Sequence, residues 1–271
     1  MDVPSFGVCI LSHGSSIDTV ELLEELFLEH EVPHAVVVEN GANPLDVERF
    51  EELALRHPKL TVIESPNLGY SSGNNLGLRT LMNKGCEWGV VFNPDVRPTG
   101  DQKIADWIKA SVAAGCTVSG PMIYDASNRV VNPLDVLSPF NAVVPMPTKR
   151  KSRIHATTGC ALALNLGAFF DLGGFDEGFF LYREEQALGY KLEANHQQWY
   201  YYQDFEVYHH HRRKVESLRS WLAHRKWEFQ STLRIFAVYQ KRSRLGIWSY
   251  QVLFVTKSAL YLLMLPFFAR R

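Results

Sequence analysis

Two motifs in this 271-residue chain bring carboxylates to places where they could do chemistry. The first is WGVVFNPD, residues 88–95, in which a short apolar run ends at Asn93 and Asp95. Amide and carboxylate oxygens are hard ligands, so this pair could hold Mg²⁺ or Mn²⁺ beside a diphosphate. Asparagine, proline and aspartate are also common turn formers, and from these residues alone a plain turn is an equally good interpretation.

The second motif is the pair Glu184 and Glu185, which opens a predicted helix over residues 184–194 after an aromatic run. A carboxylate in a partly apolar pocket can have a pKa suited to a general base. Acidic residues are also favoured in the first turn of any helix. The spacing alone leaves both interpretations open.

Three histidines, residues 209–211, follow an apolar strand pattern. One carboxylate holds a metal weakly, so a second protein ligand for the cation of Asp95 should exist, and His209 or His211 could supply it. These two share one face because strand side chains alternate. Surface histidines often have no such function, and that interpretation remains open. Zinc is not favoured, because no cysteine spacing completes a tetrahedral site.

The elements that must position these residues alternate between strands and helices. Apolar runs at 6–11, 35–38, 60–63 and 88–92 are separated by helical patterns, which indicates βαβ units and a mostly parallel sheet. In such sheets ligands bind beyond the carboxyl ends of the strands. The polar residues expected there form a candidate nucleotide site: Ser12, His13, Glu39, Asn40, Asn67 and Asp95.

The rest of the chain shows a less regular pattern. Residues 125–153 form a loop-rich insert, and a loop of that length is usually functional or disordered. The helices expected in the first 210 residues are 17–30, 47–56, 71–83, 101–113, 167–172 and 184–194, and the later strands are 116–122, 157–164, 199–202 and 205–208.

Glycines recur every fourth residue in NLGYSSGNNLGLRTL, at Gly69, Gly73 and Gly77, beside Asn74 and Asn75. They could let a helix pack close to the sheet. They could also form a helix N-terminus that binds phosphate or ribose, and the clustered asparagines favour this ligand contact. The segment is neither a Walker loop nor a GxGxxG fingerprint, which argues against a kinase or a dehydrogenase.

The overall composition is that of a globular protein, with 46% hydrophobic and 21% charged residues. The four cysteines lie far apart, so we expect them to be reduced and buried, and no signal peptide is evident at the N-terminus. The net charge of −1 hides an asymmetry: residues 212–271 carry thirteen basic and two acidic side chains, which leaves −12 on the remainder. Such a split suggests an anionic partner for the tail.

The tail predicts two helices, over 221–239 and 247–269, with Pro266 near the end of the second. Their uninterrupted apolar stretches fall short of the 18 to 20 residues, roughly, that a spanning helix needs. Basic, aromatic-rich helices fit a membrane surface. Packing on the body of the protein or homo-oligomer formation is the alternative. Nucleic acid as a partner is not expected.

Six motifs in order resemble those of bacterial glycosyltransferase family 2, and within it the rhamnosyltransferase-like enzymes. They are VENG, NLGYSSGNNLG, FNPD, TGCALAL, GGFDEGFFLYREE and VYHHH, spread over residues 6 to 211. The resemblance implies a GT-A fold over residues 1–211, with a nucleotide-binding half over about 1–98, an acceptor half over about 99–211, and a helical basic extension over 212–271.

The resemblance also implies roles for single residues. Glu39 would contact the nucleotide base, and Asn67, Gly69, Gly73, Asn74 and Asn75 would line the donor site. Asp95 would bind the metal, with Asn93 in place of the family's first aspartate and His209 nearby. Glu185 would be the catalytic base beside Glu184. The departures from the family pattern are Glu39 and Glu185, each one methylene longer than the usual residue, and Ala187, where an acid is common.

The implied activity is metal-dependent, inverting transfer of a sugar, with rhamnose a candidate, from a dTDP- or UDP-sugar to a glycan or lipid-linked acceptor. The cofactor would be Mn²⁺ or Mg²⁺, and the enzyme would work in the cytoplasm on the inner face of the cell membrane. Two alternatives remain: a catalytically weak sugar-nucleotide-binding or scaffold subunit, and a nucleotidyltransferase that makes the sugar nucleotide.

Overall fold

The computed structural model describes residues 2–41, 43–99, 101–131, 151–153, 157–197, 199–210 and 217–268. The chain divides into two compact units. The first unit comprises Met1–Phe180 and Glu184–Arg212, and the second comprises Leu181–Arg183 and Arg213–Arg271. The chain therefore leaves the first unit for three residues before Glu184 and returns to it.

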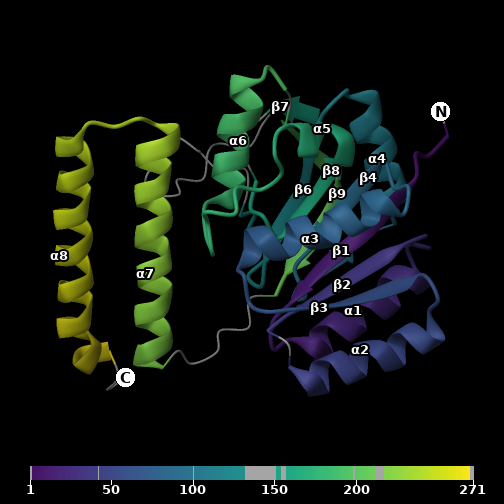
Figure 1. Cartoon of the computed structure of the whole chain (residues 1–271), viewed down its shortest axis with the longest axis horizontal. Coiled ribbons are helices and arrows are strands. Elements are labelled where there is room, and N and C mark those ends of the chain that lie inside the picture. The colour runs from purple at the N-terminus through teal and green to yellow at the C-terminus, as the bar shows by residue number, and fades with distance from the viewer. Residues whose placement is uncertain are drawn as a thin grey trace. The chain divides into compact units, whose positions relative to one another are not determined.

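A nine-stranded sheet forms the centre of the first unit, in the order β3-β2-β1-β4-β8-β6-β9-β5, with β7 paired to β9 (Figure 1). Strands β1 to β4 run parallel to one another, as do β6 and β9, whereas β5, β7 and β8 pair antiparallel with their neighbours. The predicted α/β class is confirmed. The strands are β1 Phe6–Ser12, β2 Ala35–Asn40, β3 Leu60–Ser65, β4 Trp88–Phe92, β5 Val96–Thr99, β6 Val118–Asp125, β7 Lys151–Arg153, β8 Ala161–Asn165 and β9 Trp199–His209.

Helices cover both faces of this sheet. The buried residues of α1, α2 and α4 join one apolar cluster, whereas those of α3, α5 and α6 join the other. The helices of the first unit are α1 Ser16–Leu28, α2 Pro44–Arg56, α3 Tyr70–Asn83, α4 Ile104–Ala113, α5 Leu166–Asp171 and α6 Glu184–Ala194.

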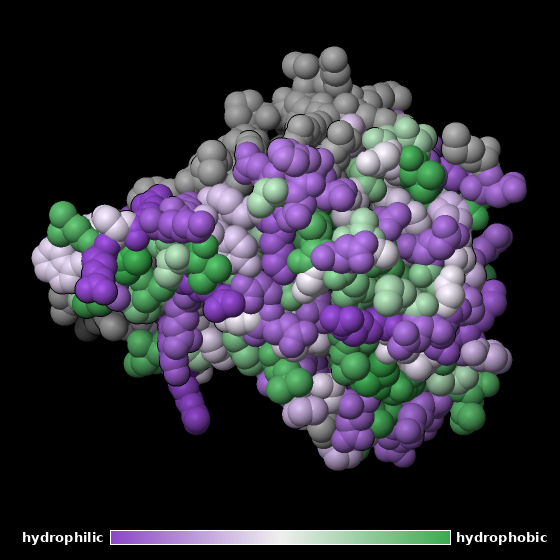
Figure 2. All heavy atoms as spheres, turned by 45° about the horizontal axis from the view of Figure 1, so that its top comes forward, coloured by the Kyte–Doolittle hydropathy of each residue, from purple (hydrophilic) through white to green (hydrophobic). Residues whose placement is uncertain are grey.

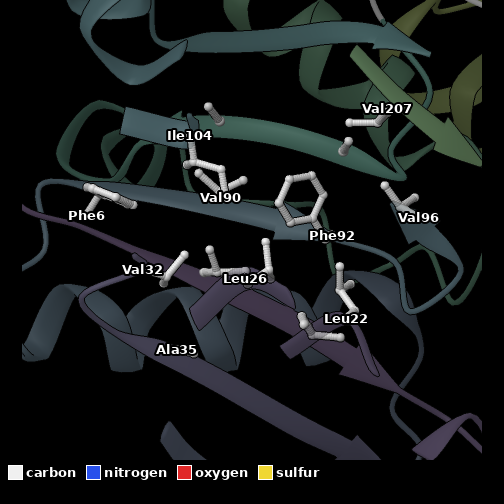
Figure 3. Packing of buried hydrophobic residues seen from close by; sticks show 14 of the residues in the cluster. Phe6, Leu22, Leu26, Val32, Ala35, Val90, Phe92, Val96, Ile104 and Val207 are labelled. Carbon is white, nitrogen blue, oxygen red and sulfur yellow. The ribbon is translucent and has the colours of Figure 1, made fainter. Parts of the chain in front are cut away.

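Alternate residues of one strand feed the two apolar clusters. In β4, Val90 and Phe92 join the cluster with α1, whereas Val91 joins the cluster on the opposite face. Figure 3 shows Phe92, the last residue of β4, in the same apolar layer as Leu22 and Leu26 of α1. A strand buried on both faces reads as a continuous apolar run, which is why WGVVF predicted it correctly. This packing fixes the point at which the chain turns toward Asp95.

Four details differ from the sequence-based expectations. Strand β5 was not expected, and residues 199–209 form one strand instead of two. Part of the loop-rich insert belongs to the sheet, because β6 extends to Asp125 and β7 pairs with β9; residues 132–150 and 154–156 lie outside the described residues. Finally, the last helix continues past Pro266 to Phe268.

The second unit contains two helices that pack on each other. They are α7 Leu218–Arg234, continued by one π-helical turn Ile235–Tyr239, and α8 Arg244–Phe268. Phe229 of α7 stacks with Tyr250 of α8 and meets Phe254 at a tilt, and the Arg225 guanidinium lies 4.1 Å from the Phe254 ring centroid. Both expected tail helices are confirmed. In the described part of the chain, no helix is long and apolar enough to cross a membrane.

Candidate active site

The carboxyl ends of the parallel strands meet at one edge of the sheet. The β1–β2 register pairs Ser12 with Glu39, and the β2–β3 register pairs Glu39 with Glu64. Parallel strands end on the same side, so the polar residues after each apolar run become neighbours. The structure therefore brings together Ser12, His13, Glu39, Asn40 and Asn67 as the strand pattern predicted.

A hydrogen-bonded network joins three of these residues. The His13 ring nitrogen Nδ1 lies 2.8 Å from the Asn40 carbonyl oxygen, an acceptor, so this nitrogen carries the proton. The Asn40 amide donates to Asn67 Oδ1 at 3.2 Å, and Asn67 Nδ2 lies 3.5 Å from His13 Nε2. Asn67 Oδ1 also accepts from the Gly69 amide at 3.2 Å. The network holds the loop between β3 and α3 against the ends of β1 and β2.

Glu39 lies beside this network and is fully buried. Neither of its carboxylate oxygens makes a hydrogen bond with any residue that the structure describes. Burial raises the pKa of the Glu39 carboxyl, and the nearby Ser12 hydroxyl opposes that rise. A buried carboxylate with so few hydrogen-bond partners is costly, and a ligand that donates hydrogen bonds would offset the cost. The ring N–H of a uracil or thymine base, or a ribose hydroxyl, has the required chemistry.

The glycines of α3 serve close packing. A Cβ on Gly73 would lie 2.3 Å from Leu11, and one on Gly77 would lie 2.3 Å from the Cys9 sulfur, so neither position tolerates a side chain without movement. Gly69, at φ +89°, lies against the backbone of Phe180. The preference for ligand contact over packing is therefore not supported at Gly73 or Gly77.

Asn74 and Asn75 use their amides inside the protein. Asn74 is fully buried and donates to the Tyr70 carbonyl at 3.0 Å. Asn75 donates to the Phe175 carbonyl and accepts from the Phe175 amide, both at 2.9 Å, and so ties α3 to the turn before α6. Both were expected to contact the donor, but these bonds indicate a structural task. Their positions in the body of the helix, away from its N-terminus, were the available signal.

Asp95 lies in a turn and also beside a histidine. The Val96 amide donates to the Asn93 carbonyl at 3.1 Å, which closes the turn predicted as the plain alternative. Strand β5 then pairs Val96 with His209 of β9, and the His209 Nε2 atom lies 3.2 Å from Asp95 Oδ1. The turn and the metal interpretations are thus compatible, because the turn delivers Asp95 to His209.

The donor set of Asp95 and His209 fits a divalent cation in part. A carboxylate oxygen and an imidazole nitrogen are both ligands that Mn²⁺ accepts. Burial alone would lower the pKa of His209, yet hydrogen bonds with Asp95 and Cys160 raise it to about 10. Within the described residues no three histidine, cysteine or acidic side chains converge as a metal site. A cation here needs further oxygen ligands, which a diphosphate could supply.

Glu184 and Glu185 begin α6, as expected, but Glu184 is more deeply buried than Glu185. Glu184 is buried, with 6% of its surface exposed, and its Oε2 makes no hydrogen bond with a described residue. Burial and then the charge of Glu185 raise the pKa of Glu184 well above its usual value. Glu185 is half-buried. Like charges that are adjacent cannot both ionise easily, so the charge of Glu185 adds to the effect of burial on Glu184.

Tyr70, which the sequence interpretation did not single out, connects the parts of the site. Its hydroxyl donates to the Gly159 carbonyl, and the neighbouring Cys160 carbonyl accepts from the Asn93 amide at 2.8 Å. Burial and then the charge of Glu184 raise the pKa of Tyr70. Tyr70 thus connects the loop before α3 with the chain that holds the Asp95 turn, and the charge of Glu184 reaches its hydroxyl.

Solved structures share this arrangement of strands and helices. GalNAc-T7 with UDP, GalNAc and Mn²⁺ matches with a TM-score of 0.65 over 78% of this chain and 44% of its own, at 16% identity. A mannosyltransferase from Pyrobaculum calidifontis in complex with GDP-Man and Mn²⁺ matches with a TM-score of 0.62 over 89% of this chain and 65% of its own, at 15% identity. This chain has the GT-A fold. At these identities the likeness establishes the fold of the GT-A domain alone.

Among curated proteins, the chain is similar to an N-acetylglucosaminyl-diphospho-decaprenol L-rhamnosyltransferase of Mycobacterium tuberculosis. The two are 28% identical over a match that covers 51% of this chain and 54% of the relative. The chain thus spans about half the length of the curated relatives that it matches. No protein-family model matches the chain. The resemblance of the GT-A domain to rhamnosyltransferase-like enzymes, stated on its motifs, is confirmed.

Proposed function

We propose that this chain is an inverting glycosyltransferase. It would transfer a sugar from a nucleoside-diphosphate donor, with dTDP-rhamnose the first candidate, to a hydroxyl of a glycan or lipid-linked glycan. The observation that carries the proposal is that one GT-A domain holds a buried Glu39 at the strand ends, Asp95 beside His209, and Glu184–Glu185 at the start of α6. The similarity to a rhamnosyltransferase supports rhamnose as the sugar and a lipid-linked glycan as the acceptor.

The donor would lie across the ends of β1, β2 and β4. Glu39 would accept hydrogen bonds from the base or ribose, and the network of His13, Asn40 and Asn67 would hold the loop that flanks it. Asp95 and His209 would hold the divalent cation, which, when bound, neutralises charge on the departing diphosphate. Asn93 would support the turn, since its backbone already bonds to Val96 and Cys160.

The carboxylate pair would handle the proton. The acceptor oxygen forms a bond to the anomeric carbon from the face opposite the diphosphate, and its proton passes to Glu185. The bond between the anomeric carbon and the diphosphate oxygen breaks, and the nucleoside diphosphate leaves with the electron pair. Because the pKa of Glu184 is raised well above its usual value, Glu184 would keep its own proton and leave the acceptor's proton to Glu185. No second carboxylate is needed to protonate the leaving group, unlike in a glycosidase.

A thermal-shift panel tests the donor site. We expect UDP-, dTDP- or GDP-sugars with Mn²⁺ to raise the melting temperature, and we expect the gain to require the metal. Asp95→Asn should lose the metal-dependent part of this gain. Asp125→Asn, at the end of β6, where the aspartate accepts a hydrogen bond from Arg129, should keep it. If none of these sugar nucleotides raised the melting temperature, the proposed donor site would be contradicted. Metal-dependent hydrolysis of the bound donor without acceptor would favour the enzyme over a binding subunit.

The second unit would bind an anionic membrane surface, placing the protein on the inner face of the membrane. Helix α8 exposes apolar side chains every three or four residues, at Leu245, Trp248, Val252 and Val255. Figure 2 shows hydrophobic side chains among strongly hydrophilic ones on this part of the chain. Basic residues flank the stripe, and a lipid-linked acceptor would be reached from that surface. A homo-oligomer formed through the same stripe is the competing use.

Vesicle co-sedimentation separates these uses. Wild-type protein should bind phosphatidylglycerol vesicles more tightly than phosphatidylcholine vesicles, and Trp248→Ser with Val252→Ser should lose this binding. Leu55→Ser, at an exposed leucine of α2, is the matched control and should keep it. Equal vesicle binding by the double variant, or a change in oligomeric state without any vesicle binding, would contradict the membrane proposal.

A further inference from the structure

The three residues before the carboxylate pair belong to the helical unit. Leu181, Tyr182 and Arg183 group by their contacts with residues 213–271, although the chain on both sides of them belongs to the GT-A domain. The segment is therefore short and anchored at both ends. Phe180, just before it, accepts a hydrogen bond from the Tyr70 amide at 2.8 Å, and Glu184, just after it, begins α6.

The backbone of this segment has an uncommon conformation. Tyr182 and Arg183 have φ angles of +72° and +69°, in the left-handed region that residues other than glycine seldom occupy. Two such residues in succession persist only where surrounding contacts hold them, and such strain clusters at functional segments. Nothing in the GGFDEGFFLYREE sequence signals this conformation, since neither residue is a glycine.

Helix α7 supplies the contacts that hold the segment. Ser231 donates a hydrogen bond from its hydroxyl to the Leu181 carbonyl at 2.7 Å. The Tyr182 hydroxyl lies 2.5 Å from His224 Nδ1, and the two rings approach with centroids 6.0 Å apart. Arg183 is buried, with 5% of its surface exposed, and its charge reaches Tyr250 of α8. Every residue of the segment is thus tied to the helical unit.

We infer that Ser231 and His224 of α7 hold the Leu181–Arg183 segment in its strained conformation, and that this conformation sets the backbone direction in which Glu184 and Glu185 follow. Ser231 and His224 are positioning residues, since they act through the segment and touch no reacting atom. This inference rests on the proposed function only for the role of Glu185. The restraint on residues 181–183 is independent of that function.

Hydrogen–deuterium exchange tests the restraint. Ser231→Ala should speed amide exchange in peptides covering residues 176–190, because the Leu181 carbonyl loses its partner, and Tyr182→Phe should do so through loss of the His224 bond. Thr256→Val is the matched control: its hydroxyl lies on α8, is exposed, and donates to the Val252 carbonyl at 2.9 Å. Ser231→Thr keeps a hydroxyl and should restore slow exchange.

Turnover of dTDP-rhamnose with Mn²⁺ tests the consequence. We expect Ser231→Ala to lower kcat about fivefold, the effect of one hydrogen bond, with an unchanged KM for the donor. Thr256→Val should retain wild-type kcat. Unchanged exchange in Ser231→Ala, or an equal loss of kcat in both variants, would overturn the inference. A wild-type protein that turns over no sugar nucleotide would instead contradict the proposed function, and the exchange data would still decide whether α7 restrains the segment.

Discussion

The strand-end crevice and the start of α6 each contain a buried glutamate, but the neighbours of the two glutamates differ. Around Glu39, the polar neighbours His13, Asn40 and Asn67 bond mainly to one another, so the carboxylate remains available to a ligand. Around Glu184, the important neighbour is a second carboxylate, and the pKa of Glu184 rises well above its usual value. The first arrangement is suited to recognition by hydrogen bonds. The second separates the protonation states of two adjacent acids, which is suited to proton transfer.

The largest expected effect comes from Glu185→Gln, because it removes the proposed general base. General-base catalysis contributes roughly 10²- to 10⁴-fold, so turnover of a sugar nucleotide should fall by that order while donor binding persists. Steady-state kinetics and the thermal shift with dTDP-sugar and Mn²⁺ measure the two properties.

Glu184→Gln is the matched control for that change. A glutamine resembles the neutral carboxyl that burial and Glu185 impose on Glu184, so turnover should change by less than about tenfold. If Glu184→Gln lost as much activity as Glu185→Gln, the division of labour within the pair would be wrong.

Asn75→Ala should mainly affect stability, which would separate polar residues that shape the crevice from those that bind a ligand. The substitution leaves the Phe175 amide and carbonyl without their partners in a buried place. The cost is about 2–3 kcal/mol of unfolding free energy. Denaturant unfolding measures it, and donor affinity in the folded fraction should be unchanged. A loss of donor affinity without a loss of stability would restore the ligand-contact interpretation of Asn75.

The sequence predicts the strands and the polar residues at their ends, because a local pattern of side chains determines both. Strands buried on both faces read as apolar runs, and the polar residue ending each run falls at the crevice, which is how Glu39, Asn67 and Asp95 were found. Strand β5 was missed because Val-Arg-Pro-Thr looks like a turn. It exists through pairing with β9, more than 100 residues away, and that pairing is what brings His209 to Asp95.

Long-range contacts also hide the roles of Tyr70 and of residues 181–183. Tyr70 lies in a motif that the sequence marks as important, but its bond to Gly159 and its proximity to Glu184 depend on the folded chain. The positive φ angles at Tyr182 and Arg183 require the helices that follow 30 or more residues later. Asn74 and Asn75 were assigned to the donor site because their types suit it. Their direction on α3 could be judged only from the packing.

Glu39→Gln should have a moderate effect confined to donor recognition. The amide can accept a hydrogen bond but carries no charge and adds a donor, so affinity for a dTDP- or UDP-nucleotide should fall about tenfold, or roughly 1.4 kcal/mol. The kcat at saturating donor should be nearly unchanged, in contrast to Glu185→Gln. A fall in kcat with unchanged affinity would mean that the two glutamates do not divide recognition and proton transfer as proposed.

The smallest expected effect concerns His30, a buried titratable group outside the candidate site. It tests whether burial alone, away from the two glutamates, affects only stability. Its Nδ1 makes no hydrogen bond with a described residue, and burial, followed by the nearby charge of Lys103, lowers its pKa. The folded state therefore binds this proton less readily than the unfolded state does. The neutral ring contributes full stability above the unfolded pKa of about 6.5, and that contribution is lost as pH falls through the folded pKa.

His30→Gln should flatten the fall of the unfolding free energy below pH 6.5. The change in slope should be at most that expected for about one bound proton, measured by denaturant unfolding at several pH values. An unchanged slope would show that the acid sensitivity of the fold comes from elsewhere. If the variant does flatten it, the buried His30 affects stability alone, whereas Glu39 at the strand ends and Glu184 at the start of α6 should affect binding and turnover.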